Sequence, residues 1–476
     1  MSDLDEWIAG QARIAAAAML AAISATHLVK DRPGFGQRIV PRPGSVLASP
    51  VPAAYDPDPD YFFHWFRDAA VVIDALRVAL AEHLVERRPA MERFAEFIEF
   101  SRRLGDLDGR AFLAQGNFRE KVAPSFLQYV RPDAEIAALS GETVLGDARV
   151  NPDGTPDISR WARPQFDGSA LRVIALLRWW RALPAADAAV LAVMRQLVAA
   201  DLRFALDNAE RPCVDIWEEE NGHHYYSLLV QAEALGRGGE WLDEAGEGAK
   251  ARACSALAAA LGSRLDAFWD GTTGYYRSRL GVTSGKPGKD LDIAVVLAVL
   301  HAGRQAGPHS VLDPKVQATL TALEELFEAD YAINRDRPPE RGPALGRYAT
   351  DVYYSGGAYF FATLAAAEFY FRLATALLSG GELAATGENR RFLERLGTAG
   401  GPMGSREAAV AAVQRGDAIM RTVQAFTPAT GDLSEQFDRN TGAQTSAKHL
   451  TWSYAAFITA AASRDQARKA GSTSFR

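Results

Sequence analysis

The chain has 476 residues, of which 48% are hydrophobic and 23% are charged, and its formal net charge at pH 7 is −7. This composition is typical of a globular protein with a large core and excludes a disordered chain. Nucleic-acid binding depends on clustered Lys and Arg, so the acidic balance argues against a nucleic-acid partner. We therefore expect a neutral or cationic ligand.

Cysteine usage and hydropathy also limit the class of protein. Two cysteines, Cys213 and Cys254, are too few for a disulfide framework and have no spacing suited to a metal centre. The apolar stretch 14–25 follows acidic residues, so we interpret it as the first helix rather than a signal peptide. We see no apolar run of about 18 residues, which predicts no membrane segment. The expectation is a cytoplasmic protein without metal or cofactor, with a monomer as the default.

Helical periodicity runs along nearly the whole chain, and strand-like alternation is nearly absent. About twelve helices are predicted, at residues 6–27, 67–85, 90–104, 168–183, 187–207, 222–236, 246–268, 291–304, 313–329, 355–379, 405–424 and 448–464. No Ser/Gly/Pro linker divides this succession. We expect an all-α protein in which residues 1–476 form a single domain.

The links between the predicted helices alternate in character. Long or motif-bearing segments precede every second helix, at residues 61–68, 161–168, 215–222, 289–292, 346–351 and 433–442. Six helical hairpins in a ring would place every second helix inside and gather these six segments on one rim. The sequence therefore predicts an (α/α)6 barrel with a binding site at the N-terminal ends of its inner helices.

Two of the rim segments are rich in carboxylates. Residues 215–222 read Asp-Ile-Trp-Glu-Glu-Glu-Asn-Gly, and residues 433–442 contain Glu435 and Asp438. Cleavage of a glycosidic bond needs one protonated carboxyl and one ionised carboxylate, so two such segments on one rim favour this chemistry. A single acidic run is also typical of a solvated face or a helix N-terminus.

Tryptophans occur beside charged residues in three rim segments, at Trp65, Trp161 and Trp217. Sugar rings present apolar faces to aromatic side chains and hydroxyls to polar groups, so this composition suits a saccharide pocket. The tryptophans are also compatible with ordinary core positions. Likewise, Arg67 with Asp68 and Arg347 with Asp351 are compatible with structural ion pairs.

Together these motifs resemble the glucoamylase family, glycoside hydrolase family 15. The matching motifs are Pro59-Asp-Tyr-Phe-Phe-His-Trp-Phe-Arg-Asp68, Arg163-Pro-Gln-Phe-Asp-Gly-Ser-Ala-Leu-Arg172, Asp215-Ile-Trp-Glu-Glu-Glu-Asn-Gly222, Gly346-Arg-Tyr-Ala-Thr-Asp351, Ser434-Glu-Gln-Phe-Asp-Arg-Asn-Thr-Gly442 and Leu450-Thr-Trp-Ser-Tyr-Ala455. The resemblance runs from about residue 6 to 464. It implies an inverting, exo-acting α-glucosidase that releases β-glucose from the non-reducing ends of α-glucans.

The resemblance also implies roles for individual residues. Glu218 would be the general acid and Glu435 the general base. The implied substrate-binding residues are Tyr61, Trp65, Arg67, Asp68, Trp161, Trp217, Glu219 and Arg347. Arg67, Asp68 and Arg347 would hold the terminal glucose, Trp161 would pack over it, Glu219 would face the leaving group and Tyr61 would lie near the base. We expect burial against Trp217 and the acidic neighbours Glu219 and Glu220 to raise the pKa of Glu218, while Glu435 stays ionised.

Some features depart from the family pattern. Phe63 stands where fungal members commonly have tyrosine, and His223-His-Tyr-Tyr226 replaces a smaller stretch. The linkage is therefore open, with a trehalase or dextran-type glucosidase as the alternative enzyme and a non-catalytic saccharide-binding protein as the alternative of another class. With no evident starch-binding module or secretion signal, we expect short malto- or isomalto-oligosaccharides as substrates.

Overall fold

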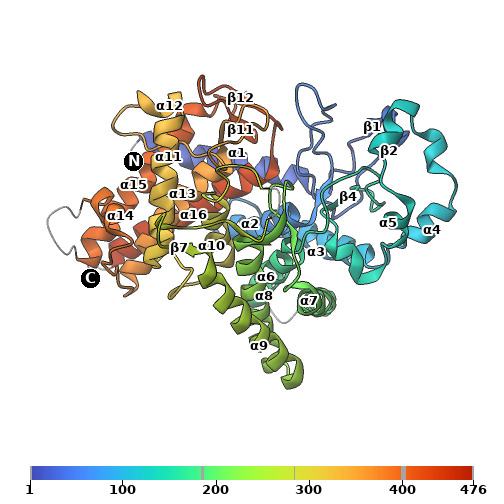
Figure 1. The fold of residues 1–476 in the computed structure, drawn as a ribbon, viewed down its shortest axis with the longest axis horizontal. Coiled ribbons are helices and arrows are strands. Elements are labelled where there is room, and N and C mark those ends of the chain that lie inside the picture. Colours follow the sequence, from blue (N-terminus) through green and yellow to red (C-terminus); the bar gives the residue numbers. More distant parts are fainter. Residues whose placement is uncertain (1–2, 184–186, 283–284, 398–403, 474–476) are drawn as a thin grey trace.

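The computed structural model describes residues 3–183, 187–282, 285–397 and 404–473. Twelve helices, labelled in Figure 1, form two rings around a common axis. The inner ring consists of α2 (Phe66–Ala81), α6 (Asp167–Ala182), α8 (Tyr225–Glu244), α10 (Ala294–Ala302), α13 (Phe360–Leu378) and α16 (Thr451–Thr473). The outer ring consists of α1 (Asp3–Ala22), α3 (Arg87–Leu104), α7 (Ala188–Asn208), α9 (Gly248–Leu265), α11 (Pro314–Asp330) and α15 (Ser405–Phe426). Each inner helix contacts the next, and α16 closes onto α2, which confirms the predicted (α/α)6 barrel.

Side-chain patterns explain which helices lie inside. The short helix α10 reads Ala-Val-Val-Leu-Ala-Val-Leu-His-Ala and buries every residue except His301, so it is apolar on all sides. The outer helix α3 instead buries one stripe, including Phe94, Phe97 and Ile98, and exposes charged residues on its other face. A helix that is apolar all round must be surrounded by protein, whereas an amphipathic helix covers a core from outside.

Helix α13 requires a correction to the sequence-based expectation. It is long and apolar enough to cross a membrane by length and composition, contrary to the prediction that no apolar run reaches that length. However, 78% of its apolar window is buried inside the protein. Such burial is what an inner helix of this barrel shows.

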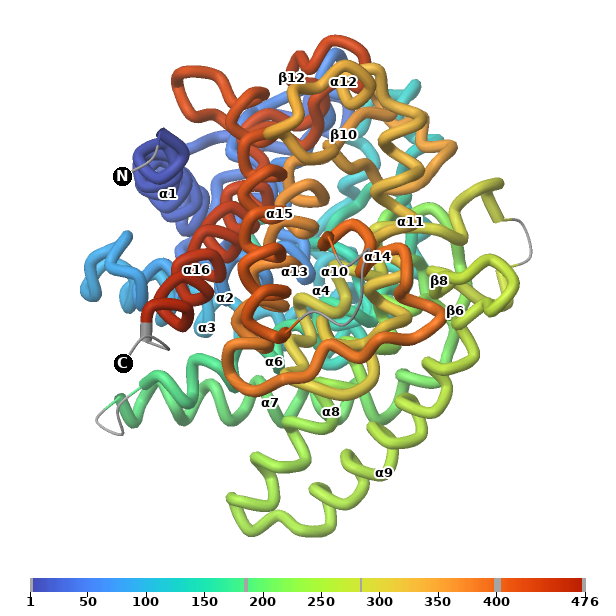
Figure 2. Tube along the Cα trace, turned by 90° about the vertical axis from the view of Figure 1, so that its left-hand side faces the viewer, coloured from blue at the N-terminus to red at the C-terminus, as the bar shows by residue number. Residues whose placement is uncertain are grey.

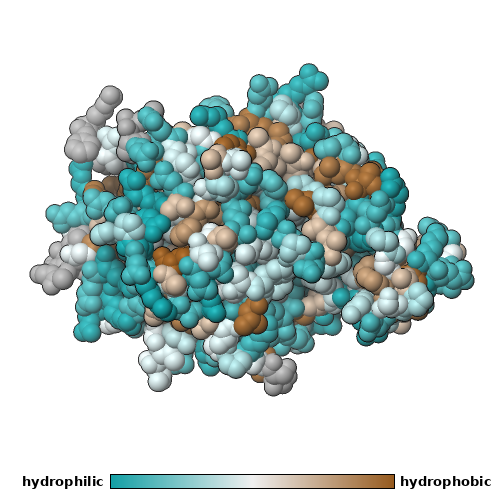
Figure 3. Space-filling view, turned by 90° about the horizontal axis from the view of Figure 1, so that it is seen from above, coloured by the Kyte–Doolittle hydropathy of each residue, from teal (hydrophilic) through white to brown (hydrophobic). Residues whose placement is uncertain are grey.

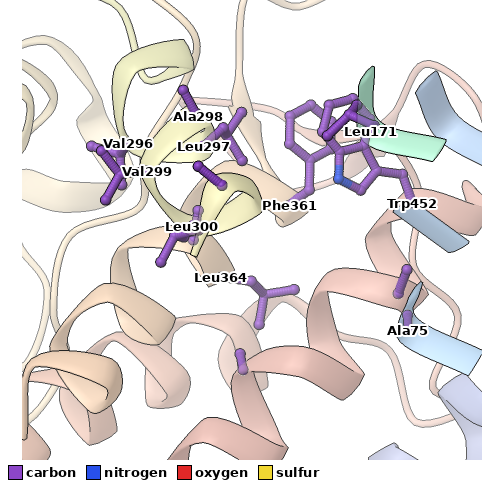
Figure 4. Packing of buried hydrophobic residues seen from close by; sticks show 14 of the residues in the cluster. Ala75, Leu171, Val296, Leu297, Ala298, Val299, Leu300, Phe361, Leu364 and Trp452 are labelled. Carbon is purple, nitrogen blue, oxygen red and sulfur yellow. The ribbon is translucent and has the colours of Figure 1, made fainter. Parts of the chain in front are cut away.

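The core inside the ring is packed with large rings and branched side chains. Phe361 of α13 stacks on Trp452 of α16 with a centroid distance of 4.5 Å and an interplanar angle of 8°. Figure 4 shows this pair beside Leu171 of α6, with Leu300 and Leu364 further along the core. Burial of such side chains stabilises a fold by about 1.5–3 kcal/mol each. The stacked pair also forms the floor of the pocket described below.

Two predicted helix ends are too early. Helix α8 was expected to end near residue 236 but continues to Glu244, because its glycines serve helix packing rather than termination. A Cβ on Gly238 would lie 2.4 Å from a Leu202 methyl group, and one on Gly239 would lie 2.7 Å from the Ser255 hydroxyl. These glycines let α7 and α9 approach α8 closely. Figure 2 shows α8 and α9 side by side at one edge of the molecule. Helix α16, expected to end at residue 464, continues to Thr473.

Short elements that the periodicity did not reveal connect the barrel helices. The remaining α-helices are α4 (Gly109–Ala114), α5 (Asp133–Ala137), α12 (Ala332–Arg335) and α14 (Arg390–Arg395). All strand pairs are antiparallel. Three sheets have two strands: β1 (Lys30–Arg32) with β2 (Gln37–Ile39), β3 (His64–Trp65) with β4 (Arg149–Val150), and β7 (Trp269–Asp270) with β8 (Tyr275–Tyr276). Two sheets have three strands, in the order β5 (Cys213–Val214), β6 (Asn221–His224), β9 (Arg279–Leu280) and in the order β10 (Ala358–Tyr359), β11 (Gln436–Phe437), β12 (Gln444–Thr445). Figure 1 shows α4, α5, β1 and β2 together at one end of the longest axis. From above, the surface is mainly hydrophilic with separate apolar patches (Figure 3).

Candidate active site

Four of the six predicted rim segments, at residues 61–68, 215–222, 346–351 and 433–442, line one pocket. Its lining comprises Ala48, Tyr61, Trp65, Arg67, Asp68, Ile216, Trp217, Glu218, Arg347, Phe361, Glu435, Leu450 and Trp452. Both predicted catalytic glutamates are among these residues, together with six of the eight predicted substrate-binding residues. The other two, Trp161 and Glu219, contact the lining through Glu218 and Arg347. Segments far apart in the sequence therefore lie together at the N-terminal ends of the inner helices.

Glu218 lies at the tip of the β5–β6 hairpin. Asp215 organises this tip, because its carboxylate accepts hydrogen bonds from the backbone N–H groups of Trp217, Glu219 and Glu220. Its other contact is the buried ammonium of Lys289, at 2.7 Å. Glu218 itself has a φ of 64°, a left-handed conformation that costs a non-glycine residue about 1–2 kcal/mol. The hairpin thus holds Glu218 in an unfavourable backbone conformation that directs its carboxyl into the pocket.

Three nitrogen donors from other rim segments hold the Glu218 carboxyl. Trp65 Nε1 donates to Oε1 at 2.7 Å, and Trp161 Nε1 donates to Oε2 at 2.6 Å. Arg67 Nη2 approaches Oε1 at 3.4 Å. Trp161 is 36% exposed, so its ring lies at the solvent side of the carboxyl. The two indole N–H groups bind different oxygens of the Glu218 carboxyl and thereby fix its orientation.

The acidic neighbours of Glu218 are neutralised, which corrects one expectation. The Glu219 carboxylate accepts hydrogen bonds, each of 2.6 Å, from Lys286 Nζ, Lys289 Nζ and Tyr348 Oη, and Arg347 Nη2 lies 3.4 Å away. Burial favours a higher pKa for Glu219, but Arg347 and the two lysines outweigh it and lower that pKa. Glu220 is buried and paired with Arg279. These two carboxylates therefore do not place uncompensated negative charge beside Glu218.

Glu435 is buried and has few donors. The β10–β11–β12 sheet positions it, since its backbone N–H donates to Ala447 O and its carbonyl accepts from Phe360 N–H. Its side chain accepts a short hydrogen bond from the Ser446 hydroxyl and a longer one, 3.4 Å, from Tyr61 Oη. Burial raises the pKa of Glu435 to about 7, although Ser446 and Arg347 favour the ionised form. Burial therefore opposes the ionised form that the resemblance implies for Glu435.

Arg67 and Asp68 line the pocket, and each has a buried polar atom without a hydrogen-bond partner in the described chain. Arg67 Nη1 is held by Gln165 and Asp167, at 3.0 and 3.2 Å. Arg67 Nε and Asp68 Oδ2 lie 3.5 Å apart, and neither has a hydrogen-bond partner in the described chain. Burial also raises the pKa of Asp68 to about 6. Buried polar atoms without partners are costly, so this pair is suited to a ligand that carries hydroxyl groups.

Arg347 and Trp217 form the opposite wall. Arg347 makes two hydrogen bonds with Asp351, at 2.7 and 2.5 Å, so the predicted ion pair exists and is buried. The Arg347 guanidinium lies 5.2 Å from the Trp217 ring. Trp217 Nε1 donates to Asp292 at 2.8 Å. Trp217 lines the pocket, its ring stacks with Phe361, and its indole N–H is anchored by Asp292.

The histidines and cysteines near the hairpin have structural contacts. His224 is buried and its Nε2 lies 3.1 Å from Cys213 O, while His223 Nδ1 lies 3.2 Å from Arg264. Cys213 and Cys254 are both buried free thiols. In the part of the chain that the structure describes, no three His, Cys, Asp or Glu side chains are placed to hold a metal ion.

Several residues of the site escaped the sequence reasoning. Tyr353 hydrogen-bonds Tyr61 at 2.9 Å, Ser446 contacts Glu435, and Phe361 and Trp452 form the floor. Trp452 lies in a quoted motif, and Tyr353 follows Asp351 by two residues, so proximity to a motif was the available signal. Nothing in the local sequence marks Ser446.

The comparisons with known proteins agree with this geometry. The family profile described as glycosyl hydrolases family 15 matches residues 115–462. The chain is 26% identical to Glucoamylase 1 of Rhizopus oryzae over 88% of its own length and 67% of that protein, and 26% identical to the intracellular sporulation-specific glucoamylase of Saccharomyces cerevisiae over 96% and 83%. A solved glycoside hydrolase family 15 glucoamylase from Hypocrea jecorina superposes with a TM-score of 0.79 at 27% identity, covering 97% of this chain and 72% of that one.

Proposed function

The chain belongs to glycosyl hydrolases family 15, and from this premise we propose that it is an inverting glucoamylase-type hydrolase with Glu218 as general acid and Glu435 as general base. In the reaction, the glycosidic oxygen takes a proton from Glu218 as its bond to the anomeric carbon breaks. Glu435 removes a proton from the water that attacks that carbon from the opposite face. The product is β-glucose together with the shortened glucan.

One observation carries this proposal: Glu218 and Glu435 line the same small pocket as Arg67 and Asp68, which contain buried polar atoms without hydrogen-bond partners in the described chain. An exo-acting enzyme must hold a terminal sugar in a closed end of its site. Hydroxyl groups of that sugar would complete the hydrogen bonds of Arg67 Nε and Asp68 Oδ2. Trp217 and the floor ring of Trp452 would contact the apolar faces of the sugar.

The remaining rim residues have supporting roles. Tyr61, hydrogen-bonded to both Tyr353 and Glu435, would help to position the attacking water. Trp65 and Trp161 would orient the Glu218 carboxyl, and the exposed ring of Trp161 would also face the substrate. Glu219 would lie on the leaving-group side, and Arg347, already paired with Asp351, would support the wall rather than offer a free charge.

Protonation sets the working state of the pocket. Glu435 acts as a base only when ionised, and its pKa of about 7 places that condition at neutral or higher pH. We infer that the enzyme acts on short α-glucosides inside the cell. This inference is supported by the likeness to an intracellular sporulation-specific glucoamylase over most of both chains.

The test is a kinetic panel with product analysis. Maltose, isomaltose, panose and trehalose are ranked by kcat/KM, and proton NMR follows the anomer of the first glucose released. We expect β-glucose first and a malto- or isomalto-oligosaccharide at the top of the ranking. Initial α-glucose would contradict inversion, preference for trehalose would reassign the substrate, and binding without hydrolysis would contradict enzyme function.

A further inference from the structure

The end of the barrel opposite the rim contains a cavity of about 590 Å³ that the proposed reaction does not use. It lies where the inner helices end. Helix α10 stops at Ala302 with Gly303 in the left-handed conformation, whereas α8, α13 and α16 are at least 19 residues long. The early end of α10 leaves room between its neighbours.

Five arginines line this cavity: Arg77 of α2, Arg178 of α6, Arg237 of α8, Arg304 after α10 and Arg372 of α13. Part of their role is structural, because backbone carbonyls at the end of α10 accept from three of them. Arg178 donates to His301 O and Ala302 O, Arg237 to Ala302 O, and Arg372 to Leu300 O. Such bonds complement the C-terminal end of a helix, but carbonyl groups carry no full charge.

Carboxylates neutralise only part of this positive charge. Asp74 is shared between Arg77 and Arg178, and Glu233 is shared between Arg237 and Arg304. Arg372 pairs with Glu368. A fourth carboxylate, Glu82, lines the cavity and has its own partner in Lys469, at 3.6 Å. Five guanidinium groups therefore face three carboxylates, which leaves two positive charges in excess.

The two arginines around Glu233 also keep donors free. Arg237 donates from Nε to Glu233 and from Nη2 to the Ala302 carbonyl of α10. Arg304 donates from Nε to Glu233 and from Nη1 to Pro308 O. Arg237 Nη1 and Arg304 Nη2 have no hydrogen-bond partner among the residues that the structure describes. Both side chains are about one fifth to one quarter exposed, so a ligand can reach them.

We propose that this basal cavity, lined by Arg77, Arg178, Arg237, Arg304 and Arg372, binds a phosphate group, either free or carried by a small sugar phosphate. Guanidinium groups match the geometry of phosphate oxygens, and a doubly charged anion would balance the excess charge. The bonds to the α10 carbonyls do not balance this excess charge, which is positive in a protein whose net charge is −7.

Calorimetric titration of the intact protein with inorganic phosphate at constant ionic strength tests this site. We expect saturable binding that Arg304→Gln weakens by about tenfold, the value of one hydrogen bond to a charged group. Arg77→Gln provides a second variant should the first affect folding. Arg93→Gln, which removes a partly exposed arginine paired with Glu96 on the outer helix α3, is the matched control and should leave binding unchanged.

A competition experiment distinguishes the two sources of the phosphate group. Displacement of inorganic phosphate by a hexose 6-phosphate, but not by the free hexose, would assign the site to a sugar phosphate, and lack of displacement would assign it to free phosphate. No saturable binding, or binding that the basal variants leave unchanged, overturns the proposal. Competitive inhibition by phosphate that survives in Arg304→Gln would place the anion in the catalytic pocket and also overturn it.

Discussion

The two segments that carry the proposed catalytic glutamates meet in one pocket but hold their carboxyls in different ways. Nitrogen donors from two other segments surround Glu218, whose backbone is in a left-handed conformation at a hairpin tip. Glu435 directly precedes strand β11, and its buried side chain accepts hydrogen bonds from two hydroxyl groups of the described residues, those of Ser446 and Tyr61. Hydrogen bonds therefore set the orientation of the Glu218 carboxyl, whereas desolvation sets the pKa of Glu435. Separate mutations can test each effect.

The largest expected effect is on turnover when either glutamate is replaced. Glu218→Gln and Glu435→Gln should each lower kcat by about 10²–10⁴-fold, because each removes a group that transfers a proton. Tm values no lower than that of the unmodified enzyme would show that the fold is kept. Glu328→Gln, which alters an ion-paired glutamate remote from the pocket, should retain activity. Turnover close to that of the unmodified enzyme in either catalytic variant would refute the assignment.

The second prediction concerns stability and separates the base from the acid. The Glu435 pKa is about 7 in the folded protein against an ordinary value of 4.5. At about 1.4 kcal/mol per unit, ionised Glu435 costs the folded state about 3 kcal/mol above pH 7, and nothing below pH 4.5, where both states are protonated. Glu435→Gln should therefore raise Tm at pH 8 and leave it unchanged at pH 4.

Glu328 gives a control of opposite sign for this stability experiment. Burial favours a higher pKa for Glu328, but its hydrogen bonds with Arg395 and Arg337 outweigh burial and lower that pKa. Its ionised form therefore stabilises the folded protein above the ordinary pKa of a glutamate. Glu328→Gln should lower Tm at pH 8. Equal Tm changes at pH 4 and pH 8 for Glu435→Gln would show that the desolvation argument is incorrect.

Sequence periodicity predicted the twelve barrel helices, because buried inner helices and amphipathic outer helices leave clear patterns. It failed at Gly238 and Gly239, whose role depends on what packs against them rather than on their neighbours in the chain. The proposed catalytic pair, Glu218 and Glu435, was chosen from motif resemblance, and the structure places both residues in one pocket. The pKa shifts in the site could not be predicted from the motifs, because the cations around Glu219 and the desolvation of Glu435 arise only when distant segments meet.

The third prediction concerns the leaving-group side of the acid segment. Both oxygens of Glu219 are occupied, and of its cationic partners Lys286 is the most exposed, at 43% for the side chain. Lys286 is therefore the cation that can move away from Glu219 and donate a hydrogen bond to a hydroxyl of the leaving sugar. Lys286→Met should lower kcat/KM for maltose by about tenfold, the value of one charge-assisted hydrogen bond.

An aryl α-glucoside is the comparison substrate for Lys286, because its leaving group has no sugar hydroxyls. Its kcat/KM should be nearly unchanged in Lys286→Met. The control is Lys250→Met, which removes an exposed lysine paired with Glu247 on the outer helix α9 and should affect neither substrate. An equal loss on both substrates would mean that Lys286 only supports the loop around Glu220 and Arg279.

The smallest expected effect is a shift of the pH profile. The acid limb of kcat/KM should lie near pH 7, because the free enzyme must ionise Glu435. The Ser446 hydroxyl stabilises the ionised form, so Ser446→Ala should raise that pKa and move the limb to higher pH by about one unit or less. Tyr61→Phe removes the longer 3.4 Å bond and should move it less. If Tyr61→Phe shifted the limb more than Ser446→Ala, the tyrosine pair rather than the serine would control the protonation of the base.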